Sequence, residues 1–423
     1  MTKNRRNSIS ARITAIFLCV SQFMHAQDQL TIDSCYSMAR TNYPLIRQYD
    51  LIAKSSEFNI SNASKAYLPQ VSATGIAGYV FGGLPSFSTP NAQAKETSNV
   101  QFIGLLQVNQ TIWDGGATKV QKEMIRANDE VERNSLNVAL YAIRERINQL
   151  YFGVLVIDEQ IKQLDLLRSL YDVSLDKVTK AKESGYSYQS DIDEVRAEIL
   201  GLEQRKIEFS YARKGYIEML SYWIGKPLPE STRLQSPSIP LQAELRRPEL
   251  ALYASQRKAL ETLLNQIKVG NRPKIGLLGA GVLIAPGINF GNATFSSVAL
   301  AGISASWNTG NLYRSSNNRQ LQKIQLDKIQ TEEETFRFNN GVQQKQTSSE
   351  IEKQRAVIRK DEEIIALKTA IKKSYQLKYD NGISPMSDLI TATNKEAEAR
   401  SNQSIHEVQL LMSLYNLKAI NGN

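Results

Sequence analysis

Cysteine and histidine are nearly missing from this chain of 423 residues, which contains only two of each. The cysteines are Cys19 and Cys35, and the histidines are His25 and His406. So few residues cannot form a paired-cysteine motif, an HExxH helix or a Cys/His cluster, which excludes zinc sites and histidine-activated nucleophiles. We therefore expect no catalytic residue, no metal site, no cofactor and no enzyme activity.

The sequence also lacks any run of 18 apolar residues, so it predicts no transmembrane helix. Its longest apolar stretch near the start, residues 13–24, follows four basic residues and precedes Ala26. This order is typical of a secretory signal peptide, predicted here at residues 1–26, and a buried N-terminal helix is the alternative. Export would leave Cys35 as a single cysteine in an oxidising compartment, where we expect it to be a small buried residue.

A clustered basic surface is missing as well, although the formal charge is +9. Four of the basic residues lie in the predicted leader, which leaves 47 basic against 42 acidic residues. These are interspersed along the chain, so no nucleic-acid partner is expected. The apolar content of 42% predicts a folded protein.

The chain repeats itself, because five matches occur in the same order in its two halves. The matches are residues 43–49 with 247–253, Pro69 with Pro273, Gly75 with Gly279, residues 113–116 with 307–310, and residues 185–192 with 382–389. We interpret this as an internal duplication in which each half contains a helix, two strands, a very long helix and a returning helix.

The duplication divides the chain into two repeats joined by a linker at 225–246, whose prolines cannot continue a helix. The first repeat, 27–224, has predicted strands at 67–81 and 100–113, a long helix at 116–183 and a return helix at 190–224. The second repeat, 247–423, has predicted strands at 273–284 and 297–308, a long helix at 310–380 and a return helix at 387–420.

Apolar residues in the first long helix and its return helix recur every 3.5 residues, which predicts a left-handed antiparallel coiled coil. They are Ile143, Ile147, Leu150, Val154, Ile157, Ile161, Leu164, Tyr171, Leu175 and Val178, followed by Ile192, Val195, Ile199 and Leu202. The second long helix is more polar, which suits the wall of a water-filled tube or, equally, an exposed arm of a soluble coiled coil.

The four predicted strands have weak alternation, and Lys274 is the single charge within them. Segments of about ten residues with this pattern are typical of transmembrane β-strands, although soluble hairpins capping a coiled coil are the alternative. Four strands cannot close a barrel, so the chain should form oligomers: two copies give eight strands and three give twelve. The helix–strand junctions are predicted at Pro69, Pro273, Gly115, Gly116 and Gly310, where proline ends a helix and glycine supplies permissive dihedral angles.

These motifs together resemble the TolC family of bacterial outer-membrane channel proteins over nearly the whole mature chain. The resemblance rests on residues 30–35, Tyr43-Pro44, residues 67–69, residues 113–116, and two Gly-x-Ser-x-x-Ser-Asp turns at 185–191 and 382–388. It implies a homotrimer in which long helices form an α-barrel tunnel in the periplasm and twelve strands form a transmembrane β-barrel in the outer membrane. It also implies the exit duct of a tripartite efflux or type I secretion system, coupled to a periplasmic adaptor (membrane fusion) protein and an inner-membrane pump of RND or ABC type.

The resemblance further implies that the two turns meet the adaptor. The docking residues would be Gly185, Ser187, Ser190, Asp191, Gly382, Ser384, Ser387 and Asp388. The alternative is that the Ser-Asp pairs merely cap the helices that follow. Candidates for an acidic ring at the periplasmic aperture are Asp191, Asp193, Glu194 and Asp388, and Thr391 stands where family members often carry a second acidic residue.

Two other functions compete with a passive channel. A periplasmic coiled-coil adaptor or scaffold would share the leader and the heptads but would not need two strand pairs. An envelope enzyme using the carboxylates of residues 332–334 is less consistent with the sequence, because that run is typical of a solvated helix face.

Overall fold

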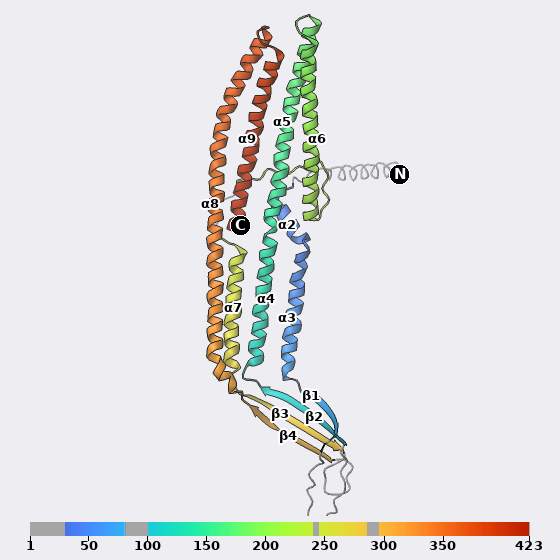
Figure 1. The fold of residues 1–423 in the computed structure, drawn as a ribbon, viewed down its shortest axis with the longest axis vertical. Helices are drawn as coiled ribbons and strands as arrows, with labels where there is room; N and C mark the ends of the chain where they lie inside the picture. The colour runs from blue at the N-terminus through green and yellow to red at the C-terminus, as the bar shows by residue number, and fades with distance from the viewer. Residues whose placement is uncertain (1–29, 80, 82–99, 240–244, 286–295, 423) are drawn as a thin grey trace, which may run out of the picture. The chain divides into compact units, whose positions relative to one another are not determined.

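The computed structural model describes residues 30–79, 81, 100–239, 245–285 and 296–422. The predicted signal peptide at 1–26 lies outside the described residues. The described elements are α2 (Ile32–Asn42), η2 (Pro44–Arg47), α3 (Gln48–Ser64), η3 (Lys65–Tyr67), β1 (Gln70–Tyr79), β2 (Val100–Trp113), α4 (Ala117–Tyr141), α5 (Ile143–Glu183), α6 (Gln189–Ile224), α7 (Pro248–Val269), β3 (Lys274–Ala285), β4 (Ser296–Ser306), α8 (Gly310–Asp380) and α9 (Met386–Asn421). The expected fold class, mainly helical with very long helices and a four-stranded antiparallel part, is confirmed (Figure 1).

The two long helices differ in continuity. Helix α8 runs for 71 residues without interruption, whereas Ala142 separates α4 from α5. Ala142 keeps right-handed helical dihedral angles, φ −60° and ψ −20°, so the interruption is a local irregularity and not a turn. None of the helices in the described ranges is both long and apolar enough to cross a membrane.

The chain forms two compact units, and each unit takes segments from both repeats. The helical unit comprises residues 30–46, 139–247 and 339–422 within the described ranges, and the strand unit comprises 47–138 and 248–338. A sequence repeat is therefore not a compact unit, because each repeat crosses both.

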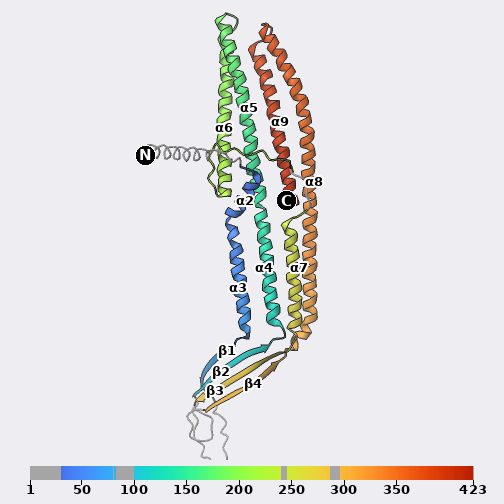
Figure 2. The same ribbon diagram turned by 180° about the vertical axis from the view of Figure 1, so that it is seen from behind.

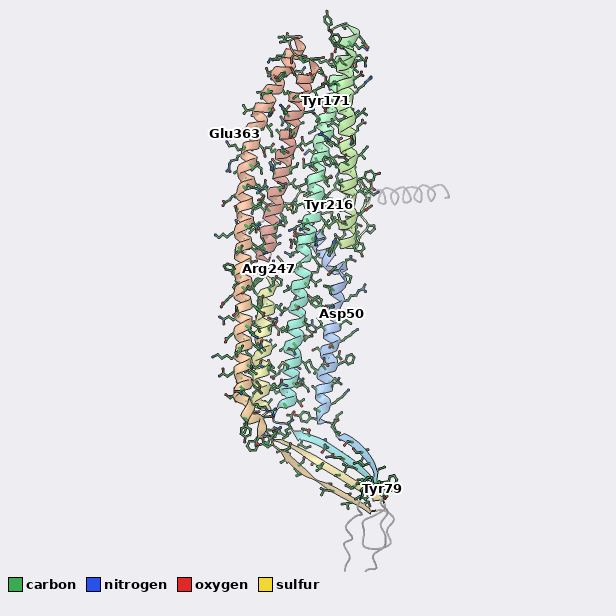
Figure 3. The ribbon with its side chains drawn as sticks, in the orientation of Figure 1. Asp50, Tyr79, Tyr171, Tyr216, Arg247 and Glu363 are labelled. Atoms are coloured by element: carbon green, nitrogen blue, oxygen red, sulfur yellow. The ribbon has the colours of Figure 1, made fainter. Side chains whose placement is uncertain are left out.

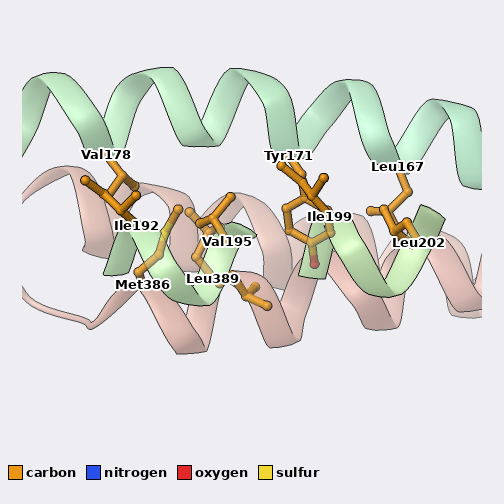
Figure 4. Packing of buried hydrophobic residues seen from close by; sticks show 10 residues of the cluster. Leu167, Tyr171, Val178, Ile192, Val195, Ile199, Leu202, Met386 and Leu389 are labelled. Atoms are coloured by element: carbon orange, nitrogen blue, oxygen red, sulfur yellow. The ribbon is translucent and has the colours of Figure 1, made fainter. Parts of the chain in front are cut away.

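The core of the helical unit follows the heptad seam. Of the residues predicted on α5, Ile147, Val154 and Val178 are fully buried. Close to the hairpin turns, α9 joins the seam through Met386 and Leu389, which pack with residues of α5 and α6 (Figure 4). The predicted coiled-coil packing of α5 with α6 is confirmed by this burial.

A close helix approach and a buried cysteine are two further features of the helical unit. Helices α5 and α6 approach closely at Gly153, where a Cβ atom would lie 2.7 Å from Cε1 of Tyr216 (Figure 3). Cys35 on α2 is fully buried, as expected, and burial raises the pKa of its thiol to about 12.

The strand unit contains one antiparallel sheet in the order β1-β2-β3-β4 (Figures 1 and 2). Strand β2 of the first repeat pairs with β3 of the second, for example Gly104 with Leu283. The two strand pairs therefore combine into one surface, with β1 and β4 at its edges.

Candidate functional site

The two helix-hairpin turns have the same backbone geometry. In the first, Gly185 has a left-handed φ of +77°, and the N–H groups of Gly185 and Tyr186 donate to the carbonyls of Lys182 (2.9 Å) and Ala181 (2.8 Å). These two bonds form a Schellman motif, which satisfies carbonyls that a helix end would otherwise leave unpaired.

The second turn repeats this arrangement. Gly382 has a φ of +70°, and the N–H groups of Gly382 and Ile383 donate to the carbonyls of Tyr379 (2.9 Å) and Lys378 (2.8 Å). Both glycines adopt a conformation that other L-residues occupy at a cost of about 1–2 kcal/mol. The repeated motif in the sequence therefore encodes a repeated turn.

Within each turn, the serine and the aspartate bond to each other. Ser187 Oγ donates to Asp191 Oδ2 at 2.6 Å, and Ser384 Oγ donates to Asp388 Oδ2 at the same distance. Asp191 Oδ2 also accepts the N–H of Tyr188 at 2.9 Å, a bond that Pro385 cannot make in the second turn. These side chains therefore stabilise the turns from inside.

The N-cap positions differ from the helix starts expected from sequence. Tyr188 and Pro385 are the N-cap residues, and neither side chain makes a cap hydrogen bond. Ser190 and Ser387 each occupy the second position of the following helix, where Ser190 is exposed and Ser387 half-buried. The aspartates act three residues beyond the N-cap, by accepting bonds from residues that precede the helix.

The four candidate aperture carboxylates lie in or beside these turns. Asp193 is exposed and accepts a bond from Gln189 Nε2 at 2.8 Å. Glu194 is half-buried, and burial raises its pKa, as do the neighbouring carboxylates Asp191 and Glu198. Among the described residues, no group of three or more His, Cys, Asp or Glu side chains is arranged to hold a metal ion.

Polar contacts connect the two hairpins of the helical unit below their turns. Lys177 on α5 forms an ion pair with Asp380 on α8, and Tyr171 Oη donates to Asn394 Oδ1 on α9 at 2.6 Å. The heptad pattern predicts that Tyr171 is buried but does not identify its partner, because the two residues are 223 positions apart.

The sheet in the strand unit has one strongly apolar face. Cross-strand partners share a face, and the register places together Val71, Ala73, Ala77 and Tyr79 of β1, Phe102, Leu106 and Val108 of β2, Leu277, Leu283 and Ala285 of β3, and Ala299, Ala301 and Ile303 of β4. Gln110 and Ser297 are the polar exceptions among the described non-glycine side chains of this face. The described part of the chain does not cover this face, since Val71 is 65% exposed and Ile303 is 80% exposed.

The opposite face is mixed. Its aliphatic residues, such as Ile76, Leu105 and Leu300, lie from the middle of the strands toward the ends that are farther from the helices. Among the side chains that the structure describes, the polar ones on this face gather at the strand ends that join the helices, and they include Gln70, Ser72, Thr74, Gln107, Asn109, Thr111, Lys274, Ser304 and Ser306. Such an arrangement is typical of a sheet with one apolar environment and one wetter one.

Asp114 organises the exit from β2. It accepts the N–H groups of Gly116 (2.9 Å) and Thr118 (2.6 Å) and the hydroxyl of Tyr67 (2.9 Å). Burial raises the pKa of Asp114, but these bonds outweigh that effect and hold the pKa at about 2. Gly115, with φ +72°, lies so close to Arg272 that a Cβ atom would be 2.7 Å from Arg272 Cβ.

The equivalent exit from β4 is built differently. Gly115 and Gly116 have positive φ values, as expected, but Gly310 does not, so the expectation of a permissive conformation at Gly310 was wrong. Gly310 is already the first residue of α8, and its N–H donates to Asn308 Oδ1 at 3.1 Å. Pro69 and Pro273 lie directly before β1 and β3, as predicted for the opposite junctions.

Comparison with known proteins gives no match to a protein-family model and none to a curated protein sequence. Solved structures do match. The outer-membrane channel OprN is 14% identical, with 93% of this chain and 90% of that chain covered and a TM-score of 0.64.

Two further matches come from named organisms. The outer-membrane protein VceC of Vibrio cholerae is 11% identical, with 93% of this chain and 96% of that chain covered and a TM-score of 0.64. The CmeC outer-membrane channel of Campylobacter jejuni is 13% identical, with 92% and 85% covered and a TM-score of 0.61. The resemblance predicted from the sequence is confirmed at the level of the fold: this chain has the fold of these outer-membrane channels.

Proposed function

We propose that this protein is the outer-membrane exit channel of a tripartite efflux or type I secretion system. It conducts substrates passively from the periplasm to the exterior when it is docked to a periplasmic adaptor and an inner-membrane pump of RND or ABC type. The chain is exported by its signal peptide, and three copies assemble into one channel that performs no catalysis.

The uncovered apolar face of the sheet is the observation that carries this proposal. A soluble protein rarely leaves so large an apolar surface exposed, whereas lipid would cover it at no cost. The sheet also has edge strands whose backbone groups must be paired in a membrane, and pairing with further copies of the chain would achieve this.

The order of the elements supports closure into a ring. In the helical unit, α5 packs against α6 and α9, and α9 bonds to α8 through Glu396 and Gln409, which gives the order α6, α5, α9, α8. In both units, first-repeat elements form one edge and second-repeat elements form the other. If the second-repeat edge of one copy joins the first-repeat edge of the next, the copies would therefore close into a ring head to tail. Twelve strands from three copies would enclose a passage, whereas eight from two would be filled by side chains.

Membrane fractionation tests the proposal. We expect the full-length protein in the outer membrane as a heat-modifiable trimer, and we expect the purified trimer to conduct ions in a planar lipid bilayer. A soluble periplasmic protein without conductance would contradict the proposal and favour the alternative, a periplasmic coiled-coil scaffold.

A further inference from the structure

The mixed face of the sheet, which lies opposite the apolar face, carries the single charged residue of the four strands. The register places Lys274 on this face, where it pairs across the strands with Ser306. Both residues are exposed. The four strands contain no aspartate or glutamate, so no carboxylate of the sheet offsets the charge of Lys274.

The chain around this end of the sheet is also basic. The ten residues that adjoin each strand here contain two acidic residues, Asp114 and Glu123, and six basic ones, Lys65, Lys119, Lys122, Lys268, Arg272 and Arg314. Asp114 is 5% exposed, and both of its oxygens accept hydrogen bonds. Ion pairs that the structure describes in the strand unit lie farther along the helices, as between Lys258 and Glu130. The electrostatic potential at this end of the sheet is therefore positive.

We propose that Lys274 makes the strand-lined part of the passage selective for anions, so that the channel favours anionic over cationic substrates. This inference rests on the proposed function, because it takes the apolar face to contact lipid and the mixed face to line the passage. Three copies then place three Lys274 side chains at one level, and rings of basic residues select anions in pores. Asp191 and Asp388 belong to the helical unit, so a substitution at Lys274 changes the charge of the strand unit alone.

The test measures the reversal potential of the purified full-length trimer in planar bilayers of zwitterionic lipid, with about 50 mM KCl on one side and about 150 mM on the other. This potential gives the ratio of chloride to potassium permeability. We expect Lys274→Gln to lower the ratio at least about threefold, and Lys274→Glu to lower it further, because both remove the positive ring. Lys274→Arg is the matched control and should keep the ratio within about 1.5-fold, since arginine keeps the charge.

Ser306→Glu gives an independent measurement with Lys274 in place. Because Ser306 is the cross-strand partner of Lys274, a carboxylate at this position would offset the lysine and lower the ratio as Lys274→Gln does. Both positions are exposed, so circular dichroism and trimer content should match the unsubstituted protein.

Salt separates an effect of charge from a change in the shape of the passage. At about 1 M KCl the Debye length falls to about 3 Å, so the permeability ratios of all variants should converge to within about 1.5-fold.

The outcomes distinguish the inference from the function on which it rests. An unchanged ratio in Lys274→Gln at low salt, an equal loss in Lys274→Arg, or a difference that persists at about 1 M KCl would overturn the inference while leaving the channel function standing. If the unsubstituted trimer does not conduct ions, the proposed function fails and the inference fails with it.

Discussion

Replacing Glu396 with glutamine tests how the α8–α9 hairpin is held together. The Glu396 side chain is 5% exposed and forms ion pairs with Lys372 and Arg400, the second at 2.7 Å. It also accepts the hydroxyl of Thr369 at 2.8 Å. Glutamine keeps the size of the side chain but removes its charge, which leaves two cations without a counter-ion.

The magnitude follows from the pKa of Glu396. Burial raises this pKa, but the bonds from Lys372, Arg400 and Thr369 outweigh burial and lower the pKa from 4.5 to about 2. That difference corresponds to about 3 kcal/mol. Because the Arg400 side chain is 48% exposed and partly screened by solvent, we expect the substitution to cost about 2 kcal/mol.

Hydrogen exchange in the detergent-solubilised protein measures this loss locally. At pH 7, amides of α8 and α9 beside Glu396 should exchange about 30-fold faster in the variant, the factor that about 2 kcal/mol gives. The folded-state pKa lies below the unfolded value, so the stabilisation is present above pH 4.5 and is lost as the pH falls toward 2. The ratio of variant to wild-type rates should therefore shrink to about fourfold at pH 3.

Glu363→Gln is the matched control. Glu363 lies on α8, the other helix of the same hairpin, and pairs with Lys360 at 2.7 Å, but both side chains are more than 60% exposed (Figure 3). Exposed pairs contribute little, so its exchange ratio should stay within about twofold. The reasoning is refuted if Glu396→Gln has no larger effect than this control, or if its ratio is the same at pH 7 and pH 3.

Three other predictions can be checked by thermal unfolding of the solubilised trimer. Gly153→Ala should destabilise the α5–α6 hairpin by about 1–3 kcal/mol because its Cβ would overlap Tyr216; Tyr216→Leu in the same chain should recover much of the loss, and equal losses with and without it would contradict the clash. Gly382→Ala should lower the free energy of unfolding by about 1 kcal/mol, because alanine adopts the positive φ of this position only at a cost. Gly201→Ala, in open space within α6, should instead raise the free energy of unfolding by about 1 kcal/mol. A change of the same sign at both sites would contradict the role given to the positive φ. Asp114→Asn should lower stability by about 2 kcal/mol at pH 7, since one of its acceptor oxygens is lost, and an unchanged melting temperature would disprove that role.

Part of the candidate site could be predicted because it depends on local chemistry. The Gly-x-Ser-x-x-Ser-Asp motif predicts both turns, since glycine after a helix favours the left-handed conformation and the residues involved are neighbours in sequence. The role of the serine and aspartate was predicted less well. They bond to each other, which becomes apparent only when the direction of each side chain is known.

The strand junctions show the same division. A Trp-x-x-Gly motif follows both strand pairs, but Gly115 and Gly116 have positive φ values and Gly310 does not. The side chain before the glycine does not explain this difference, because Asp114 and Asn308 accept equivalent bonds from Gly116 and Gly310. The two junctions differ at the intervening residue, which is Gly115 in the first and Thr309 in the second. The motif therefore predicts where each strand returns to a helix, but not the backbone conformation of its last glycine.

The sequence by itself determined the duplication, the heptad seam and the position of the four strands, because each depends on the spacing of residues within one segment. Only the tertiary structure decided that β2 pairs with β3, that compact units cross the repeats, and that Glu396 is held by Lys372 and Arg400. The physical reason is the range of the interactions: periodic burial is set by neighbours a few residues away, whereas register and ion pairing depend on which distant segment supplies the partner.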